Sequence, residues 1–222
     1  MNASRFLLAP AIAAALLAGA PTPALAQAKP AAAATRADSA SALVLENSKR
    51  ILSTLESRRA EFTRNRAALR QFIATEFNQM FDREYAARLV LGAHGRGASE
   101  ADVRLFADAL ADNLMQRYGS SLLDFNTRLQ VRVRSETALR GGSIVKVSSE
   151  YLREGAPPIP VDYLMRKVGG QWKVFDVMVE GVSFVQTFRS QFDAPLRQKS
   201  IAQVAADLKA GRLQAGSGSG GR

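Results

Sequence analysis

Residues 160–188 read PVDYLMRKVGGQWKVFDVMVEGVSFVQTF, and this stretch decides the fold. Apolar residues are dense on both sides of Gly169-Gly170, and a two-residue glycine connection between such runs is typical of a β-hairpin. After Gly181 the apolar residues follow a helical spacing, at Val182, Val185, Phe188 and Phe192. The stretch therefore predicts two antiparallel strands that pass abruptly into a helix over about residues 182–199.

Two more strands are predicted upstream, because apolar and polar residues alternate over residues 129–134 and 145–151. Gly141-Gly142 is expected to join these two strands, and Ala156-Pro157-Pro158 to join the second to the third. Four consecutive strands with short connections predict an antiparallel meander. Alternation with one apolar face indicates a sheet that is wetted on the other face.

Helices are predicted both before and after these strands in the sequence. Apolar residues recur at helical spacing over residues 43–55, 69–81, 85–90 and 99–118, and Ser200 is a predicted N-cap for a last helix. Helices followed by an antiparallel sheet with one apolar face predict an α+β fold. We expect the helices to pack on one face of a four-stranded antiparallel sheet.

The two ends of the chain differ in composition from the middle. A basic start, an apolar run and Ala24-Leu25-Ala26 predict a secretory signal peptide over residues 1–26. Residues 27–41 read as a flexible leader, 42–213 as one domain and 214–222 as a Gly/Ser tail. The prediction places the mature protein in an exported compartment.

Charge narrows the choice of partner. The net charge is +10, which in the cytosol would favour nucleic acid, but export argues against that partner. Anionic headgroups or acidic protein faces remain, and Arg128, Arg132 and Arg134 share the polar face of the first predicted strand. The alternative is that these charges only keep the surface solvated.

Groups for catalysis or metal binding are sparse. The chain has no cysteine and one histidine, His94, between glycines. Asp176 and Glu180 lie about 13 Å apart if both belong to one strand, too far for a glycosidase pair; Glu180 and Ser183 are better placed as acceptors at a helix start. We therefore predict no enzyme activity, no catalytic residue, no metal site and no cofactor.

The other residues of the predicted helices and strands that could form a site are apolar. A solid core and a ligand cavity use the same apolar residue types, so periodicity does not distinguish them. The aromatic residues that the helices offer are Phe72, Phe77, Phe81, Phe106, Phe184, Phe188 and Phe192. Both alternatives stay open on the residues alone.

Three stretches resemble the MlaC / toluene-tolerance family of periplasmic phospholipid-binding proteins, and one of them is residues 98–118, where Phe and Leu recur at helical spacing before a final Tyr. Residues 81–92 are similar to its F-D-x-x-x-x-A-R-x-V-L-G stretch, and residues 172–185 to its W-x-V-x-D-V-x-(I/V)-E-G-V-S-x-(V/I) run. The likeness extends over about residues 42–213. One departure is Gly95, where the family often has an aromatic residue.

The resemblance implies a nuclear-transport-factor-like or cystatin-like roll whose apolar cavity holds phospholipid acyl chains, with the headgroup outside. It implies a periplasmic shuttle between an outer-membrane lipoprotein–porin complex and an inner-membrane ABC transporter complex. For the lipid-binding walls we predict inward residues of the sheet and of the following helix: Val145, Val147, Val161, Tyr163, Met165, Phe184 and Phe188.

Three alternatives remain beside this prediction. A carrier of another lipid, such as a hopanoid, would use the same kind of cavity. An envelope adaptor would have a solid core and bind no lipid. A lipid hydrolase would need a nucleophile and base, and His94 is the only histidine.

Overall fold

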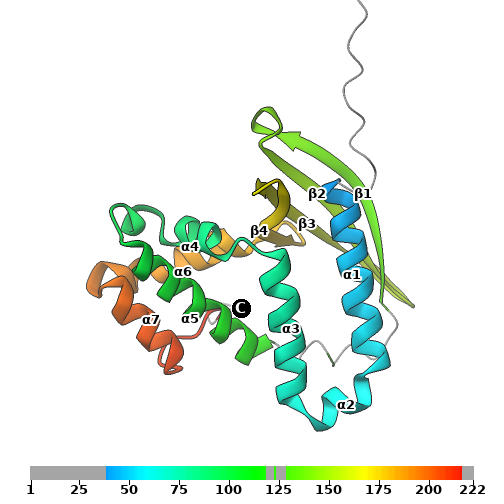
Figure 1. The fold of residues 1–222 in the computed structure, drawn as a ribbon, viewed down its shortest axis with the longest axis horizontal. Coiled ribbons are helices and arrows are strands. Elements are labelled where there is room, and N and C mark those ends of the chain that lie inside the picture. The colour runs from blue at the N-terminus through cyan, green and yellow to red at the C-terminus, as the bar shows by residue number, and fades with distance from the viewer. Residues whose placement is uncertain (1–38, 119–122, 124–128, 217–222) are drawn as a thin grey trace, which may run out of the picture. The chain divides into compact units, whose positions relative to one another are not determined.

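The structure is a computed structural model that describes residues 39–118, 123 and 129–216. In this part of the chain helices pack against a five-stranded antiparallel sheet in the order β1-β2-β3-β4-β5 (Figure 1). This arrangement confirms the predicted α+β class. The helices are α1 (Ala40–Ser57), α2 (Arg59–Arg64), α3 (Arg66–Met80), α4 (Arg83–Leu91), α5 (Glu100–Tyr118), α6 (Phe184–Gln198) and α7 (Ile201–Lys209). The strands are β1 (Gln130–Leu139), β2 (Ile144–Arg153), β3 (Ala156–Val168), β4 (Gln171–Val179) and β5 (Val182–Ser183). Of the helices so described, none is long and apolar enough to cross a bilayer.

The predicted hairpin around Gly169-Gly170 is confirmed. Val168 lies opposite Gln171, so the turn between β3 and β4 holds only the two glycines. Their φ angles are 56° and 82°, in the region that a Cβ atom makes costly by about 1–2 kcal/mol per residue. Glycine at both positions therefore sets the turn and, through it, the register of the two strands.

The connection between β2 and β3 lies earlier than predicted. The turn is Glu154-Gly155, with Gly155 at a φ of 70°, and not Ala156-Pro157-Pro158. The two prolines belong to β3, beside a register shift that follows Tyr151. Proline has no N–H to give to a regular ladder, and an irregular site tolerates that loss. The prolines thus mark an irregularity inside the strand.

A short fifth strand replaces the predicted direct passage from β4 into the helix. Glu180 and Gly181 form a turn with φ angles of 52° and 81°. Val182 then pairs with Val179, and α6 begins only at Phe184, after the N-cap Ser183. The helical spacing extended the predicted helix two residues too far, because Val182 fits both a helical stripe and a strand.

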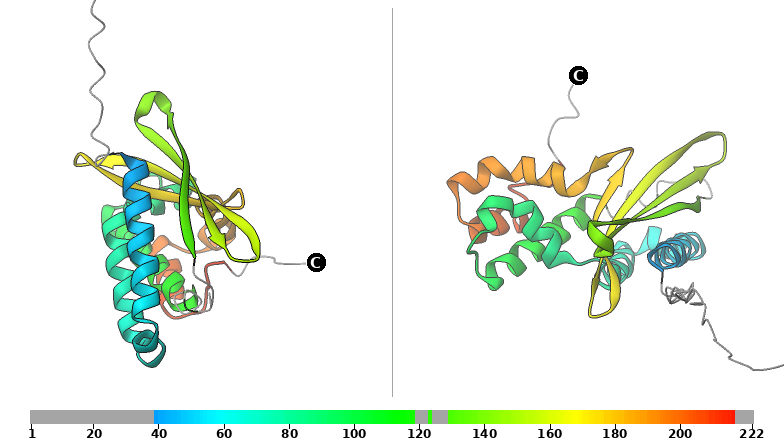
Figure 2. Two further views of the ribbon diagram at one scale, coloured as in Figure 1. Left: turned by 90° about the vertical axis from the view of Figure 1, so that its right-hand side faces the viewer. Right: turned by 90° about the horizontal axis from the view of Figure 1, so that it is seen from above.

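The helix α1 packs on the sheet and buries one of its faces (Figure 2). Beneath it the Tyr151 hydroxyl donates to Ser48 Oγ at 3.0 Å and lies 2.9 Å from the Tyr163 hydroxyl. These bonds satisfy polar atoms in an otherwise apolar layer. We call this layer the α1–sheet core; its buried members are Ala40, Val44, Val145, Val147, Val161, Tyr163, Met165 and Val174.

A second core joins α4, α5, α6 and α7, which gather away from α1 in Figure 1. Phe106 of α5 meets Phe192 of α6 edge to face, with ring centroids 5.6 Å apart. The segment after α7 belongs to this core, because Ala215 is fully buried and its N–H donates to Asn113 Oδ1 at 2.9 Å.

The ends of the domain differ from the predicted limits of residues 42 and 213. α1 already begins at Ala40, where Ser39 Oγ accepts from the Ala42 N–H at 3.1 Å. At the other end Ala215 is buried and Gly216 partly buried, and both donate hydrogen bonds to helix side chains, so the predicted tail starts too early. The predicted signal peptide, the leader up to residue 38 and residues 217–222 lie outside the described residues.

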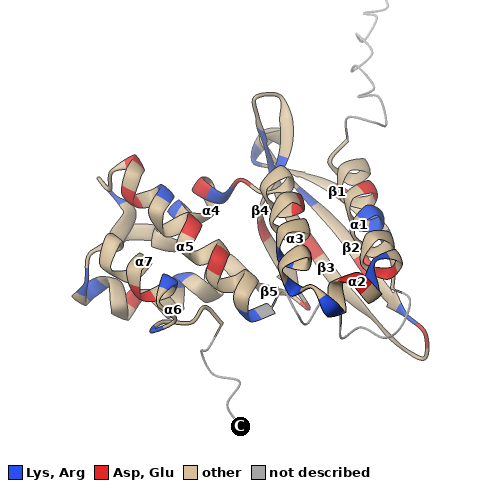
Figure 3. Ribbon diagram, turned by 60° about the horizontal axis from the view of Figure 1, so that its bottom comes forward, with Lys and Arg blue, Asp and Glu red and all other residues tan. Residues whose placement is uncertain are grey.

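The predicted basic patch on the first strand is partly neutralised, because its two described arginines share one carboxylate. Arg132 and Arg134 both reach Glu150 of β2, at 2.7 and 3.7 Å. Arg134 also falls in a register shift between Val133 and Ser135. Charges of both signs are interspersed over the sheet (Figure 3). Arg128 lies outside the described residues.

Candidate functional site

A large cavity of about 860 Å³ lies between β4 and the helices α3, α4, α5 and α6. Its lining is mainly apolar and comes from elements far apart in the sequence. Polar side chains on its wall include Asn78, Arg83, Asp112, Asp176 and Thr187. The larger apolar side chains are Ile73, Phe77, Phe81, Val90, Leu110, Leu114, Met115, Phe175, Val177, Val179, Val182, Phe184, Val185 and Phe188.

A β-bulge in β4 turns Phe175 toward the helices. Leu164 pairs with Asp176 and Met165 with Val174, which leaves Phe175 as the extra residue of β4. A bulge re-aims side chains and increases the local twist. Phe175 meets the ring of Tyr85 on α4 edge to face at 5.1 Å. The strand thus supplies Val174 to the α1–sheet core and Phe175 to the cavity.

Asp176 anchors the start of α6. Its Oδ1 accepts from the Val185 N–H at 3.0 Å, and its Oδ2 accepts from the Ser183 hydroxyl at 2.6 Å. Ser183 Oγ in turn accepts from the Gln186 N–H at 3.0 Å. A carboxylate at a helix N-terminus satisfies free amides and favours the helix dipole. The Ser183 prediction is confirmed, but Asp176 takes the place predicted for Glu180, which sits in the preceding turn.

This anchor positions the two predicted residues of the helical wall. Phe184 and Phe188 both line the cavity, and their rings stack with centroids 6.0 Å apart. Phe184 is 46% exposed, so it lies where the cavity meets solvent, whereas Phe188 is buried. Ligand contact at Phe184 and Phe188 stays a prediction.

The five predicted residues of the sheet wall lie elsewhere. All are buried in the α1–sheet core, and none belongs to the cavity lining. α1 covers their face, with Ala40 and Val44 close against the strands. Burial raises the pKa of the Tyr163 hydroxyl well above its usual range. Ligand contact at these positions stays a prediction: Val145, Val147, Val161, Tyr163 and Met165.

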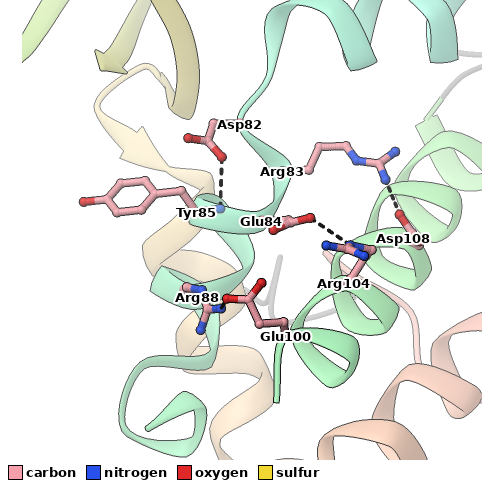
Figure 4. Close-up of polar contacts among 8 residues, drawn as sticks. All are labelled: Asp82, Arg83, Glu84, Tyr85, Arg88, Glu100, Arg104 and Asp108. Atoms are coloured by element: carbon pink, nitrogen blue, oxygen red, sulfur yellow. Dashed lines mark hydrogen bonds and ion pairs between the residues drawn. The ribbon is translucent and has the colours of Figure 1, made fainter. Parts of the chain in front are cut away.

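A polar cleft of about 720 Å³ adjoins the cavity, and both are lined by Asn78, Phe81 and Arg83. Three ion pairs connect α4 to α5 along this cleft (Figure 4). Arg83 reaches Asp108, Glu84 pairs with Arg104 at 2.9 Å, and Arg88 with Glu100 at 3.2 Å.

At the strand side of the same cleft, Asp82 connects α4 to β3. Its Oδ2 accepts from Arg166 at 2.6 Å and its Oδ1 caps α4 by accepting from the Tyr85 N–H at 3.1 Å. The Arg166 guanidinium also lies 4.0 Å from the centre of the Tyr85 ring. The Phe81-Asp82 motif of the sequence therefore builds the junction between sheet and helices.

The single histidine lies apart from the cavity lining. His94 Nε2 is 2.9 Å from Asp193 Oδ1, and Asp193 also pairs with Arg197 at 2.7 Å. The bond to His94, aided by Arg197, lowers the pKa of the Asp193 carboxyl. Within the described ranges no group of three or more His, Cys, Asp or Glu residues is placed to hold a metal ion.

Comparisons with known proteins identify a family and several relatives of this chain. A family model described as MlaC protein matches residues 45–210. The toluene tolerance protein Ttg2D of Pseudomonas putida is 25% identical over 165 residues, covering 73% of this chain and 76% of its own. The intermembrane phospholipid transport system binding protein MlaC of Haemophilus influenzae is 21% identical over 147 residues, covering 65% and 68%.

A solved structure shares the fold. It is a phospholipid-binding protein from Ralstonia solanacearum in complex with a phospholipid, 20% identical, with a TM-score of 0.68 over 78% of this chain and 97% of that one. The family match spans most of the described residues, including both cavity walls. The chain therefore belongs to the MlaC family.

Proposed function

We propose that the protein is a phospholipid carrier that holds acyl chains in the cavity between β4 and the helices. The cavity of about 860 Å³ carries this proposal, since its volume lies at the upper end of the usual range for ligand sites, about 300–1,000 Å³. Its lining is mainly apolar, as hydrocarbon chains require. The related fold from Ralstonia solanacearum is in complex with a phospholipid, which supports the same ligand class here.

The energetics suit a carrier that both loads and unloads. Each CH₂ group taken out of water contributes about 0.8 kcal/mol, so the chains do not leave the cavity into solvent. A bilayer is about as apolar as the cavity, so exchange with a membrane has a small net free energy. Contacts with hydrocarbon are non-directional, and we expect weak selection for chain length.

The family and the predicted signal peptide over residues 1–26 support a proposal for the place of action. Together they support a periplasmic shuttle between the outer and inner membranes. Its proposed partners are an inner-membrane ABC transporter complex and an outer-membrane lipoprotein–porin complex. The relative from Haemophilus influenzae is named as part of an intermembrane phospholipid transport system.

Lipid extraction tests the proposal. Protein purified from a Gram-negative host is extracted with organic solvent, and the lipid is identified and counted by mass spectrometry. We expect near-stoichiometric phospholipid. A hopanoid in its place would make the protein a carrier of another lipid, and no bound lipid at all would favour an envelope adaptor.

Two substitutions on α5 test whether the lipid is bound in the cavity. Ala111 lines the cavity, so Ala111→Trp should fill part of it and lower the lipid content at least twofold. Ala101 is exposed on the same helix, and Ala101→Trp serves as the matched control. Equal lipid content in the two variants would place the ligand elsewhere.

A further inference from the structure

The cleft and the cavity share one wall. Asn78, Phe81 and Arg83 line both, so the polar cleft opens at the border of the apolar cavity. Arg83 stands at this border between two helices. It donates to Asn78 Oδ1 of α3 at 2.7 Å and pairs with Asp108 of α5. A ligand with an apolar and a polar end would find both environments within one continuous site.

The charges of the cleft leave one cation in excess. Five cationic and four acidic side chains line it. Four of the cations are arginines, each with a carboxylate partner. The fifth is Lys173, whose Nζ donates to the Gln79 carbonyl oxygen. Over residues 39–118, 123 and 129–216, no carboxylate lies within ion-pair distance of Lys173. Its charge therefore remains available to an anion.

Arg83 can bind an anion without releasing its partners. A guanidinium has five N–H donors, and the bonds to Asn78 and Asp108 use only its two terminal nitrogens. Its side chain is 31% exposed. Figure 4 shows it reaching across from the start of α4 toward Asp108 on α5. A phosphate oxygen at the cleft would thus meet a fixed guanidinium and a nearby ammonium, which form strong charge-assisted hydrogen bonds.

We infer that the cleft binds the phosphodiester of a lipid whose acyl chains fill the cavity, with Lys173 and Arg83 as the donors. This inference rests on the proposed function and adds a headgroup site to it. One excess positive charge matches the single negative charge of a phosphodiester. The ion pair with Asp108 holds Arg83 in place, and the bond to the Gln79 carbonyl oxygen holds Lys173.

Competition between two lipids with identical chains tests this inference. Lipid-free protein is incubated with uncharged maltoside micelles that contain equal amounts of dioleoylphosphatidylglycerol and dioleoylglycerol, and the bound lipids are counted by mass spectrometry. The wild type should take up the phosphatidyl lipid in at least tenfold excess. Lys173→Gln and Arg83→Gln should each lower this ratio about tenfold, because each removes a donor to the phosphodiester.

Two further variants make the result specific. Lys173→Arg keeps the charge and should keep the preference. Arg132→Gln removes an arginine that pairs with Glu150 on the sheet, outside cleft and cavity, and should behave as wild type. If Arg83→Gln does not fold, the ratio measured for Lys173→Gln decides the inference.

The outcomes separate this inference from the proposed function. Equal uptake of both lipids by the wild type would overturn the headgroup site and leave the carrier function standing. Uptake of neither lipid would remove both. Inorganic phosphate is the second probe: if it bound the lipid-free protein and stayed bound after loading with the phosphatidyl lipid, the cleft would be a site for free phosphate and the inference would be wrong.

Discussion

Asp176 holds two walls of the cavity together through bonds to Val185 and Ser183. Asp176→Ala leaves the buried Val185 N–H and the partly buried Ser183 hydroxyl without this acceptor, and we expect it to lower the free energy of unfolding by about 2–3 kcal/mol. Asp176→Asn keeps one acceptor and should cost less. Urea denaturation measures both. Asp162→Ala is the control, because Asp162 makes only a partly exposed pair with Lys146 at 3.8 Å and such pairs contribute about 1 kcal/mol or less. A wild-type midpoint for Asp176→Ala would show that the anchor is dispensable.

Val147 distinguishes a packed sheet face from a ligand wall. It is fully buried beneath α1, so Val147→Glu places an unpaired charge in a solid layer and should cost about 3–5 kcal/mol of stability. Thermal melting with measurement of bound lipid reports the effect. Leu139→Glu places the same charge at a position that is 37% exposed and outside both the cavity and the cleft, and it should shift stability by no more than about 0.5 kcal/mol. Wild-type melting with loss of lipid in Val147→Glu would instead assign the sheet face to the ligand.

At the scale of elements, the segment after α7 completes the second core. Asn113 is buried, and its side chain donates to the Leu208 and Leu213 carbonyl oxygens at 2.9 and 3.1 Å and accepts from Ala215. Gln191 similarly accepts from the Gly216 N–H at 2.8 Å, and Gly216 lines the cavity. The segment therefore connects α5 and α6 at one side of the ligand site.

Deletion of residues 213–222 should destabilise the protein by about 2–4 kcal/mol, because it removes buried Ala215 and leaves Asn113 with unsatisfied polar atoms. It should also lower the lipid content by opening the cavity wall. Deletion of residues 217–222 spares all of these bonds and is the control. Denaturant midpoints and extracted lipid are compared for the two. Identical midpoints would mean that the core is complete without this segment.

The sequence predicted those elements whose residue types act locally. Gly169-Gly170 determines a hairpin by its φ angles, and the stripe with Phe184 and Phe188 determines a helix face. The bulge at Phe175 has no such signal, because an extra residue changes which side chains share a face without changing the apolar pattern. The alternation in β2 and β3 correctly predicted a buried face. Whether α1 or a cavity covers that face depends on tertiary packing, which periodicity does not contain.

At the scale of the whole molecule, several carboxylates keep their charge to unusually low pH. Glu150 has a lowered pKa because Arg132 donates to it, and Asp193 because His94 does. Asp207 is nearly buried, and its pKa is lowered by Lys199 first and Arg212 second, at 2.6 and 2.7 Å. Each of these groups binds its proton more weakly in the folded than in the unfolded chain, so acid favours unfolding.

The sign of this linkage gives a pH prediction. The pKa of an unfolded aspartate is about 3.9, and the pKa of folded Asp207 is lower. Its contribution to stability is complete above the unfolded pKa and is lost as the pH falls through the folded pKa. The melting temperature of the wild type should therefore drop steeply below about pH 4. Asp207→Asn should melt lower than wild type at pH 7, and the gap should close in acid because Asn cannot titrate. A gap that stayed constant from pH 7 to pH 3 would mean that Asp207 stabilises the α6–α7 junction through hydrogen bonds alone, with no contribution from its charge.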